Sequence, residues 1–469
     1  MKVSSFFSAQ DMTVGHPLSR LLQFSIPLLI GNLAQQMYNT VDSIVVGRFV
    51  GDNALAAVGA SGPVLNLLLV LFMGIASGGG IMVSQYFGAK DRENLSHTVG
   101  TTITLTFFAG IAIMLLGPLL THPLMTALST PAEIYGMSCT YLIIVFLGIL
   151  GCAYYNILSG ILRGLGDSVT PLLFLLLACG LNIVLDILFV AVFHWDVMGV
   201  ALATIISQAL SAALCMVRLC RMKSTLDVNL PVLRPQKALV LKLAKLGLPS
   251  GLTQAVFSLA SIIVQALTNS FGTTVITCAI VVMRVDGFAM MPNFTFGASM
   301  ITYSGQNIGA GKLDRVRRGT RGGLLLGLSC SVLLTLCLLL FGGSLMRLFT
   351  DTAEVVEMGI HMMRILAVGY IAVSVTQVLC GVMSGAGDTI TPMIISLVTT
   401  VAIRVPLAYT IAHFTKSETL PAGSPDSLFI SLLISWVIGA LLSCFFYRFG
   451  RWHKKAHEFV RTTSENSCA

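Results

Sequence analysis

Charged side chains are scarce in this chain of 469 residues, of which only 10% are Asp, Glu, Lys or Arg. Soluble domains carry about 25% charged residues, because their surfaces face water. Hydrophobic residues make up 55% of the sequence, and apolar runs of about 20 residues recur along its whole length, as in membrane-spanning helices. The sequence does not show the shorter alternating pattern of β-barrel strands. The composition therefore excludes a soluble multidomain protein and predicts an all-α integral membrane protein.

The sequence also lacks the patterns of catalytic and metal centres. Its eleven cysteines are scattered, with no Cys-x-x-Cys pair, which argues against a structural metal site. The eight histidines form no cluster, and no nucleophile is spaced to meet a general base. No cleavable signal peptide is evident before the first apolar run. We therefore expect a protein that is not an enzyme and has no cofactor.

The basic residues behind the net charge of +8 are distributed as expected for a multi-pass membrane protein. Most of the 28 Lys and Arg residues fall in clusters separated by pairs of apolar spans. The clusters are Lys2 with Arg20, Lys90 with Arg92, Arg163 alone, Arg218 to Lys245, Lys312 to Arg321, and Arg448 to Arg461. The positive-inside rule places this face, and both termini, in the cytoplasm. The charge therefore predicts a multi-pass protein of the inner (plasma) membrane, surrounded by lipid, and gives no support to nucleic-acid binding.

The apolar runs predict twelve transmembrane helices. The predicted spans are 22–46, 54–82, 95–118, 133–158, 169–193, 197–219, 242–270, 274–303, 317–342, 357–381, 391–413 and 427–449. A polar, basic linker at 220–241 separates an N-lobe of six spans, residues 1–219, from a C-lobe of six spans, residues 242–450. Residues 451–469 form a cytoplasmic tail.

The two lobes share a duplicated sequence. The string Gly-x-x-x-Gly-x-Gly-Asp-[Ser/Thr]-x-Thr-Pro occurs at 160–171 and again 221 residues later at 381–392. Gln85 and Gln306 match at the same offset, and Pro27 matches Pro249 at an offset of 222. Because six spans return the chain to the side it entered from, the lobes should be related by a pseudo-twofold axis along the membrane normal.

Each glycine-rich string falls at a predicted cytoplasmic turn. Glycine permits tight turns and close helix approach, and Asp167 and Asp388 are placed to cap the helices that follow. Phosphate binding is the alternative reading, but the Lys-[Ser/Thr] of a P-loop is missing.

Acidic residues well inside the predicted spans are limited to Asp42, Asp186 and Asp286. An ionised side chain at that depth costs at least about 2.5–3.5 kcal/mol, so such residues are candidates for function. Asn182 and Asp186 lie one helical turn apart on one face, and Thr204 on the next span could add a hydroxyl. We predict that Asp42, Asn182, Asp186 and Thr204 form a proton- or cation-coupling site, with structural polar packing as the alternative. Hard oxygen ligands would make the same four residues the metal ligands if Na⁺ is the ion.

The C-lobe lacks these groups but carries other charges. The offset of 221 maps Asn182 to Ile403 and Asp186 to Leu407, while Asp286, Arg284 and Arg404 lie in C-lobe spans. An ion pair of Asp286 with Arg404 and a substrate-facing role are both open. Further candidates for lining a substrate cleft are Gln35, Asn39, Gln254, Met283 and Met290, and Pro27 is a candidate hinge in the polar first span.

The chain resembles the multidrug and toxic compound extrusion (MATE) transporters along essentially its whole length. The resemblance rests on the twelve spans in two lobes, the first span ending in Asp42-Ser-Ile-Val-Val-Gly47, the Gln85 and Gln306 turns, and both Gly-Asp-x-x-Thr-Pro strings. It is similar to the DinF-like branch, whose N-lobe site would consist here of Asp42, Asn182, Asp186 and Thr204. The acidic residues that another branch places on spans 7 and 10 are missing, which puts C-lobe coupling in doubt.

The resemblance implies a secondary antiporter, and we expect the protein to be a monomer. Such a protein would export small amphipathic, often cationic organic compounds in exchange for H⁺ or Na⁺ by alternating access. A lipid-linked oligosaccharide flippase of the same superfamily is an alternative, although a more cationic cleft would be expected. A membrane receptor or scaffold is a second alternative, but it would need neither duplicated lobes nor intramembrane carboxylates.

Overall fold

The computed structural model describes residues 10–468 apart from 348, 351 and 419, with side-chain environments given up to residue 463. Within that part the chain is helical and contains no strand, as the composition predicts. Lys2, which belongs to the first basic cluster of the sequence, lies outside the described residues. The fold class therefore agrees with the expected all-α membrane protein.

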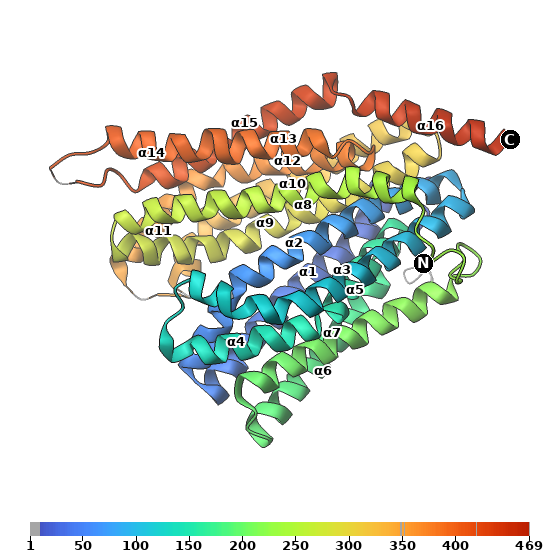
Figure 1. Ribbon diagram of the computed structural model, residues 1–469. Coiled ribbons are helices and arrows are strands. Elements are labelled where there is room, and N and C mark those ends of the chain that lie inside the picture. Colours follow the sequence, from blue (N-terminus) through green and yellow to red (C-terminus); the bar gives the residue numbers. More distant parts are fainter. Residues whose placement is uncertain (1–9, 348, 351, 419, 469) are drawn as a thin grey trace. The chain divides into compact units, whose positions relative to one another are not determined.

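The first half of the chain forms seven α-helices and two short π-helical segments (Figure 1). They are α1 (Pro17–Val45), η2 (Val46–Val50), α2 (Asp52–Ala89), α3 (Arg92–Ala127), α4 (Ala132–Leu147), α5 (Ile149–Gly164), α6 (Val169–Asp186), η3 (Ile187–Val192) and α7 (Asp196–Arg221). Within this half α5 packs against α2 and α7, and α6 packs against α7.

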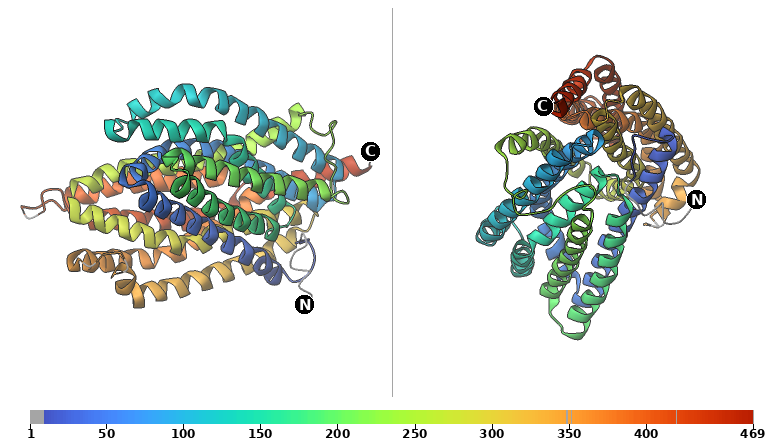
Figure 2. Two further views of the ribbon diagram at one scale, coloured as in Figure 1. Left: turned by 90° about the horizontal axis from the view of Figure 1, so that it is seen from below. Right: turned by 90° about the vertical axis from the view of Figure 1, so that its right-hand side faces the viewer.

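The second half continues with nine α-helices and one π-helical segment. They are α8 (Lys237–Ser270), α9 (Thr273–Gly309), α10 (Leu313–Arg347), α11 (Ala353–Ala367), α12 (Gly369–Gly385), α13 (Ile390–Leu397), η4 (Val398–Arg404), α14 (Val405–Phe414), α15 (Asp426–Phe449) and α16 (Trp452–Cys468). Here α12 packs against α9, α10 and α15, and Figure 2 shows these long helices from two further sides.

Eleven of the twelve predicted spans are long and apolar enough to cross a membrane. Among the described residues, nine spans pass this test as single elements, and two helix pairs pass when each is counted as one span. The pairs are α4 with α5, bent by 54°, and α11 with α12, bent by 45°. The remaining predicted span is α1, whose 29 residues would extend about 43 Å at 1.5 Å per residue. Its asparagine and glutamine residues make it too polar to pass as an apolar helix.

The chain divides into two packed units, and two of the three borders between them fall inside helices. Unit 1 comprises Met1–Asp11 and Gln23–Gly251, and unit 2 comprises Met12–Leu22 and Leu252–Ala469. The first residues of α1 therefore belong to unit 2, and the first residues of α8 belong to unit 1. The sequence division at 220–241 follows the repeat, whereas these units follow the packing.

The beginning of α8 belongs to unit 1 because it crosses α2 with almost no space between the backbones. A Cβ atom built on Gly74 would lie 2.9 Å from the carbonyl oxygen of Gly247, and one on Gly247 would lie 2.6 Å from that of Gly74. Gly78 and Gly251 extend the contact by one turn on each helix. Both helices thus present a Gly-x-x-x-Gly pattern, which lets transmembrane backbones approach closely.

The segment before α1 is held by the α9–α10 turn of unit 2. The backbone N–H of Met12 donates to Oε1 of Gln306 at 3.0 Å, and Asn307 donates to the Met12 carbonyl at 3.2 Å. Arg315 donates to the carbonyls of Met12 and Val14 at 3.1 and 3.0 Å. Gln306, which the repeat singled out, therefore helps to hold the chain that leads into α1.

The first two glycines of the N-lobe string allow α5 to pack on α2. A Cβ atom on Gly160 would lie 3.2 Å from the carbonyl oxygen of Ala76, and one on Gly164 would lie 2.8 Å from that of Gly80. These contacts are too short for any side chain without a shift of the backbone. The predicted role of glycine in close helix approach is therefore confirmed for this string.

The C-lobe string makes the equivalent contacts. Gly385 faces the carbonyl oxygen of Ile301 on α9, where a Cβ atom would lie at 2.5 Å, and Gly381 faces that of Gly297. Residues 297 and 301 are 221 positions after residues 76 and 80, the same offset as between the two strings. The duplication thus repeats a backbone contact between helices.

The aspartates of both strings stabilise the helix starts, as predicted. Asp167 accepts hydrogen bonds from the backbone N–H and the hydroxyl of Thr170 at 3.0 and 2.7 Å, and Arg218 pairs with it at 3.2 Å. Asp388 likewise accepts from the threonine three residues later and pairs with Lys455 of α16 at 3.2 Å. Buried carboxylates with such partners fit a capping role, which leaves them unsuited to binding phosphate.

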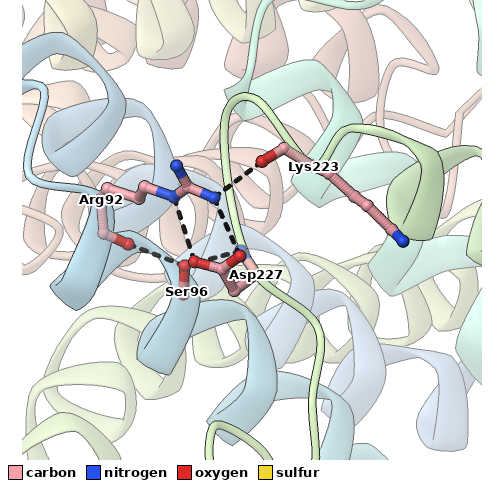
Figure 3. Close-up of polar contacts among 4 residues, drawn as sticks. All are labelled: Arg92, Ser96, Lys223 and Asp227. Carbon is pink, nitrogen blue, oxygen red and sulfur yellow. Dashed lines mark hydrogen bonds and ion pairs between the residues drawn. The ribbon is translucent and has the colours of Figure 1, made fainter.

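The linker between α7 and α8 rests on α3 through a group of polar contacts (Figure 3). Arg92 forms a two-pronged ion pair with Asp227 and donates to the carbonyl of Lys223 at 2.7 Å. The N–H of Asp227 donates to the hydroxyl of Ser96 at 3.0 Å. One turn further along α3, Gly100 leaves no room between the helix and the backbone of Val232.

Replacing Gly100 with Ala should release the linker from α3, because the new methyl group would overlap the Val232 carbonyl. Overpacking of this kind costs about 1–3 kcal/mol, so trypsin cleavage within 222–236 should become about tenfold faster. Arg92→Ala should have a smaller effect, since its ion pair is half exposed. Gly59→Ala is the matched control, because a Cβ there meets nothing within 4 Å. Equal cleavage of Gly100→Ala and the wild type would contradict the contact.

Candidate ion-coupling site

Two of the three intramembrane carboxyl groups are neighbours. Asp42 lies near the end of α1 and Asp186 is the last residue of α6, and each carboxyl group is an electrostatic neighbour of the other. The side chain of Asp186 is fully buried, while Asp42 is partly exposed. Neighbouring carboxylates repel each other unless a proton or a cation lies between them.

The local backbone changes where Asp186 lies. The α-helical pattern of α6 ends at this residue and the π-helical segment η3 begins at Ile187. Such π-turns are rare and are found frequently at functional sites. Asn182, one turn earlier, is also 0% exposed, so that both polar side chains of α6 point into the interior of the unit.

The polar atoms of this region have few partners within the protein. Both carboxylate oxygens of Asp186, Oδ1 of Asp42, and both amide atoms of Asn182 are buried without a hydrogen bond among the described residues. Buried polar groups are normally hydrogen-bonded, because desolvation without a partner costs about 1–3 kcal/mol each. The arrangement therefore has unused acceptor oxygens that a proton or a small cation could satisfy.

Two tyrosines complete the site and were not predicted from the sequence. Tyr38 lies one turn before Asp42 on α1 and is the shared neighbour of Asp42, Asp186 and Thr204. Tyr141, from α4, is a further neighbour of both carboxyl groups. Tyr38 is 8% exposed and Tyr141 is 6% exposed. Tyr141 is distant in sequence from the other residues of the site and gave no signal, whereas the one-turn spacing of Tyr38 and Asp42 was available in the sequence.

The surroundings of the site are apolar, and among the described residues no basic side chain is an electrostatic neighbour of the two carboxyl groups. Val46, Val190, Val197 and Val200 form a hydrophobic cluster with Tyr141. Arg48, the nearest basic residue in sequence, is exposed and forms no ion pair with Asp42 in the part of the chain that the structure describes. The donor set consists of carboxylate, amide and hydroxyl oxygens, which suits a proton or a hard cation such as Na⁺.

The structure places the four predicted coupling residues in one region of unit 1. Asp42, Asp186 and Thr204 are neighbours of Tyr38. Asn182 lies one helical turn before Asp186 on α6. No group of three or more His, Cys, Asp or Glu side chains that could hold a metal ion occurs among the described residues. Their role in ion coupling stays a prediction.

The other candidates of the first half lie on the polar face of α1. Gln35 donates to Asn39 at 3.4 Å, in an exposed contact between successive turns. Pro27 lies within α1, which runs without interruption from Pro17 to Val45. Its role as a hinge therefore stays a prediction.

The candidates of the second half are divided between the surface and the core. Gln254, Met283 and Arg284 are exposed on α8 and α9. Met290 is 7% exposed and belongs to the hydrophobic core of unit 2. The cleft-lining role of these residues stays a prediction.

Asp286 and Arg404 form a second polar group, together with Tyr370 of α12. Asp286 has Tyr370 and Arg404 as its electrostatic neighbours. The sequence left a close ion pair of Asp286 with Arg404 open, but no N–O distance within 4.0 Å joins them in the described structure. Oδ1 of Asp286, the hydroxyl of Tyr370 and Nε of Arg404 are buried and lack hydrogen bonds among the described residues.

The chain matches proteins and structures of one transporter family. The MatE family model matches residues 27–188 and 249–410, one match in each half. "Probable multidrug resistance protein YoeA" of Bacillus subtilis is 30% identical over 420 residues, covering 88% of this chain and 91% of that protein. "Probable multidrug resistance protein YpnP" of the same organism is 29% identical and covers 95% and 98%.

A solved structure shows the same fold. A MOP superfamily transporter from Pyrococcus furiosus superposes with a TM-score of 0.87 at 22% identity, covering 95% of this chain and 98% of that chain. The two family matches coincide with the duplicated halves that carry the glycine-rich strings. This protein therefore belongs to the MatE family of membrane transporters, whose members are not enzymes.

Proposed function

We propose that this protein is a secondary antiporter that exports amphipathic, often cationic organic compounds in exchange for H⁺ or Na⁺. The observation that supports it most directly is the pair of neighbouring carboxyl groups, Asp42 and Asp186, in an apolar part of unit 1. Relatives named as multidrug resistance proteins support the substrate class. The plasma membrane is the location that fits this activity.

In this mechanism the ion enters from outside and changes the charge balance of the site. With both carboxylates ionised, their repulsion favours an arrangement in which Asp42 and Asp186 move apart. A proton on one carboxyl group, or a Na⁺ ion between the two, removes that repulsion and favours the closed arrangement. Because Asp42 lies on α1 and Asp186 on α6, occupancy of the site would move α1 relative to α6.

The tyrosines and Thr204 would adapt to both states of the site. A hydroxyl group can donate to a carboxylate or accept from a carboxyl proton, so Tyr38 can stay in contact in either case. Asn182 offers a carbonyl oxygen to a cation and an N–H donor to a carboxylate. Export would follow by alternating access, because substrate and ion favour different states of the same protein.

Transport by purified protein in liposomes tests this proposal. Vesicles loaded with a cationic dye would receive either a proton gradient or a sodium gradient of equal size, with the membrane potential clamped. We expect dye movement to be driven by one of the two gradients and to stop when an ionophore collapses it. Dye movement that responds to neither gradient would contradict ion-coupled antiport.

A further inference from the structure

The last helix of the chain, α16, leaves the end of α15 after a break in direction (Figure 1). It is not among the described helices that are long and apolar enough to cross a membrane. Gly450 permits the break, because a Cβ atom there would overlap the carbonyl oxygen of Phe446. Trp452 is 2% exposed, stacks on Tyr447 with ring centroids 5.1 Å apart, and donates from Nε1 to the Tyr447 carbonyl at 2.7 Å. A defined contact therefore attaches α16 to the last span.

One face of α16 covers two turns at the same end of unit 2. Lys455 donates to the carbonyl of Gly387 at 3.1 Å and pairs with Asp388 at 3.2 Å, both in the turn between α12 and α13. Further along α16, Val460 lies beside the turn between α9 and α10, where a Cβ atom on Gly311 would be 3.7 Å from its Cγ1 atom. α16 also packs against α9. The helix is therefore docked on the unit and does not extend freely from it.

The ion pair in this contact joins a buried acid to a partly exposed base. The side chain of Asp388 is 2% exposed and that of Lys455 is 35% exposed. In the part of the chain that the structure describes, no other basic side chain lies within 4.0 Å of the Asp388 carboxylate. A buried charge that loses its partner is costly, because it has already lost its water. The α12–α13 turn therefore depends on α16 for the charge balance of Asp388.

The first half of the chain balances the matching aspartate with a residue of a span. Asp167 lies 221 residues before Asp388 and accepts a hydrogen bond from the threonine three residues later, as Asp388 does. Its cation is Arg218, which belongs to α7, a helix long and apolar enough to cross a membrane. Such a helix cannot leave the bilayer without exposing its apolar surface to water. The second half instead carries the equivalent cation on a helix that can separate.

We propose that α16 is a C-terminal latch on the α12–α13 turn, with Lys455 as the positioning residue that closes it. When α16 is docked, it holds the turn in the observed conformation. When α16 leaves, it takes the cation away from Asp388, and the turn opens because its buried carboxylate has lost its partner. The tail thereby controls the turn that joins the fourth and fifth spans of the second half. The inference does not rest on the proposed antiport, because docking can be measured without transport.

Amide hydrogen exchange of the purified full-length protein in detergent tests the latch. In Lys455→Gln we expect exchange to become about tenfold faster both in α16, at 452–463, and in the turn, at 386–391, because one opening exposes both segments. Lys455→Arg keeps the charge and should exchange as the wild type does. Lys455→Gln combined with Asp388→Asn should keep the fast exchange of α16 but slow that of the turn, since replacing both partners of a buried pair by neutral groups is often tolerated.

Lys454→Gln is the matched control. The side chain of Lys454 is 81% exposed and pairs with Glu458 inside α16 at 3.9 Å, so the variant removes the same charge from the same helix without touching the turn. It should leave the exchange of both segments unchanged. Arg218→Gln should speed up exchange of the first-half turn, at 165–170, without any effect on α16.

Trp452→Ala releases α16 through a different contact and should expose the same two segments, so it decides the question if Lys455→Gln does not fold. Faster exchange of α16 beside an unchanged turn would mean that the helix docks without holding the turn. Unchanged exchange of both segments would mean that Lys455 does not hold α16. Either result, in a variant whose other segments exchange as in the wild type, overturns the latch, while the proposed antiport is judged separately by the liposome experiment.

Discussion

Replacing Asp186 with Asn should abolish ion-driven export while leaving the protein folded in the membrane. Asn has nearly the shape of Asp but can neither bind a transported proton nor offer two anionic oxygens to Na⁺. Because Asp186 is fully buried and has no hydrogen-bond partner among the described residues, removal of its charge should not destabilise the fold. Coupling between two ligands is typically worth about 1–3 kcal/mol, so we expect export to fall by about 100-fold.

The measurement is dye export from liposomes under the gradient that drives the wild type. Asp42→Asn should give the same loss, since both carboxyl groups are needed for the repulsion that an ion relieves. Glu133→Gln, which changes an exposed carboxylate at the start of α4, is the control and should retain activity. Export by Asp186→Asn at the wild-type rate would remove Asp186 from the coupling mechanism.

The parts of the fold that depend on local sequence could be predicted. Apolar length placed the spans, and the duplicated strings indicated both the repeat and the turns, because glycine and aspartate have specific backbone roles there. The contacts of Gly164 with Gly80 and of Gly385 with Ile301 confirm this reading. The residue types of the strings indicate such turns and close contacts, although they do not identify the helix that is contacted.

The parts that depend on packing between distant helices could not be predicted. Tyr141 lies on α4 and meets Asp42 and Asp186 only after the helices assemble. The same limit applies to Arg404, whose opposite charge suggested a close ion pair with Asp286, because no ion pair joins the two within the described structure. The place of Met290 in the core of unit 2 was not predictable either, because an apolar residue of a transmembrane helix can face the core, lipid or a cleft, and its type does not distinguish them.

The duplicated sequence does not predict that α8 is divided between the two packed units. By sequence, α8 begins the second half, but its residues up to Gly251 pack within unit 1 and those from Leu252 onward within unit 2. The Gly-x-x-x-Gly crossing with α2 accounts for the first assignment. Lys242 adds to it by donating to the hydroxyl of Tyr86 on α2 at 3.1 Å. The beginning of α8 is therefore held to α2 by both backbone fit and a polar contact.

Replacing Gly247 with Leu should break this crossing and reduce both folding and export severely. A Cβ atom at this position would lie 2.6 Å from the carbonyl oxygen of Gly74, and neither backbone can yield without separating the helices. Overpacking costs about 1–3 kcal/mol when side chains can adjust, so a clash with backbone should reach at least the upper end of that range. We expect the yield of monodisperse protein from membranes to fall about tenfold or more, together with the loss of dye export.

Gly59→Leu provides the matched control, because it adds the same side chain to α2 at a position where a Cβ meets nothing within 4 Å. It should be produced and should export dye as the wild type does. Gly247→Ala introduces the same backbone clash with a smaller side chain, so its yield of monodisperse protein should lie between those of the wild type and Gly247→Leu. The comparison separates the effect of the Cβ atom from that of the rest of the leucine side chain. Since α8 passes from one unit into the other at Gly251, a fully folded and active Gly247→Leu protein would mean that α8 is not held on α2 as the structure shows.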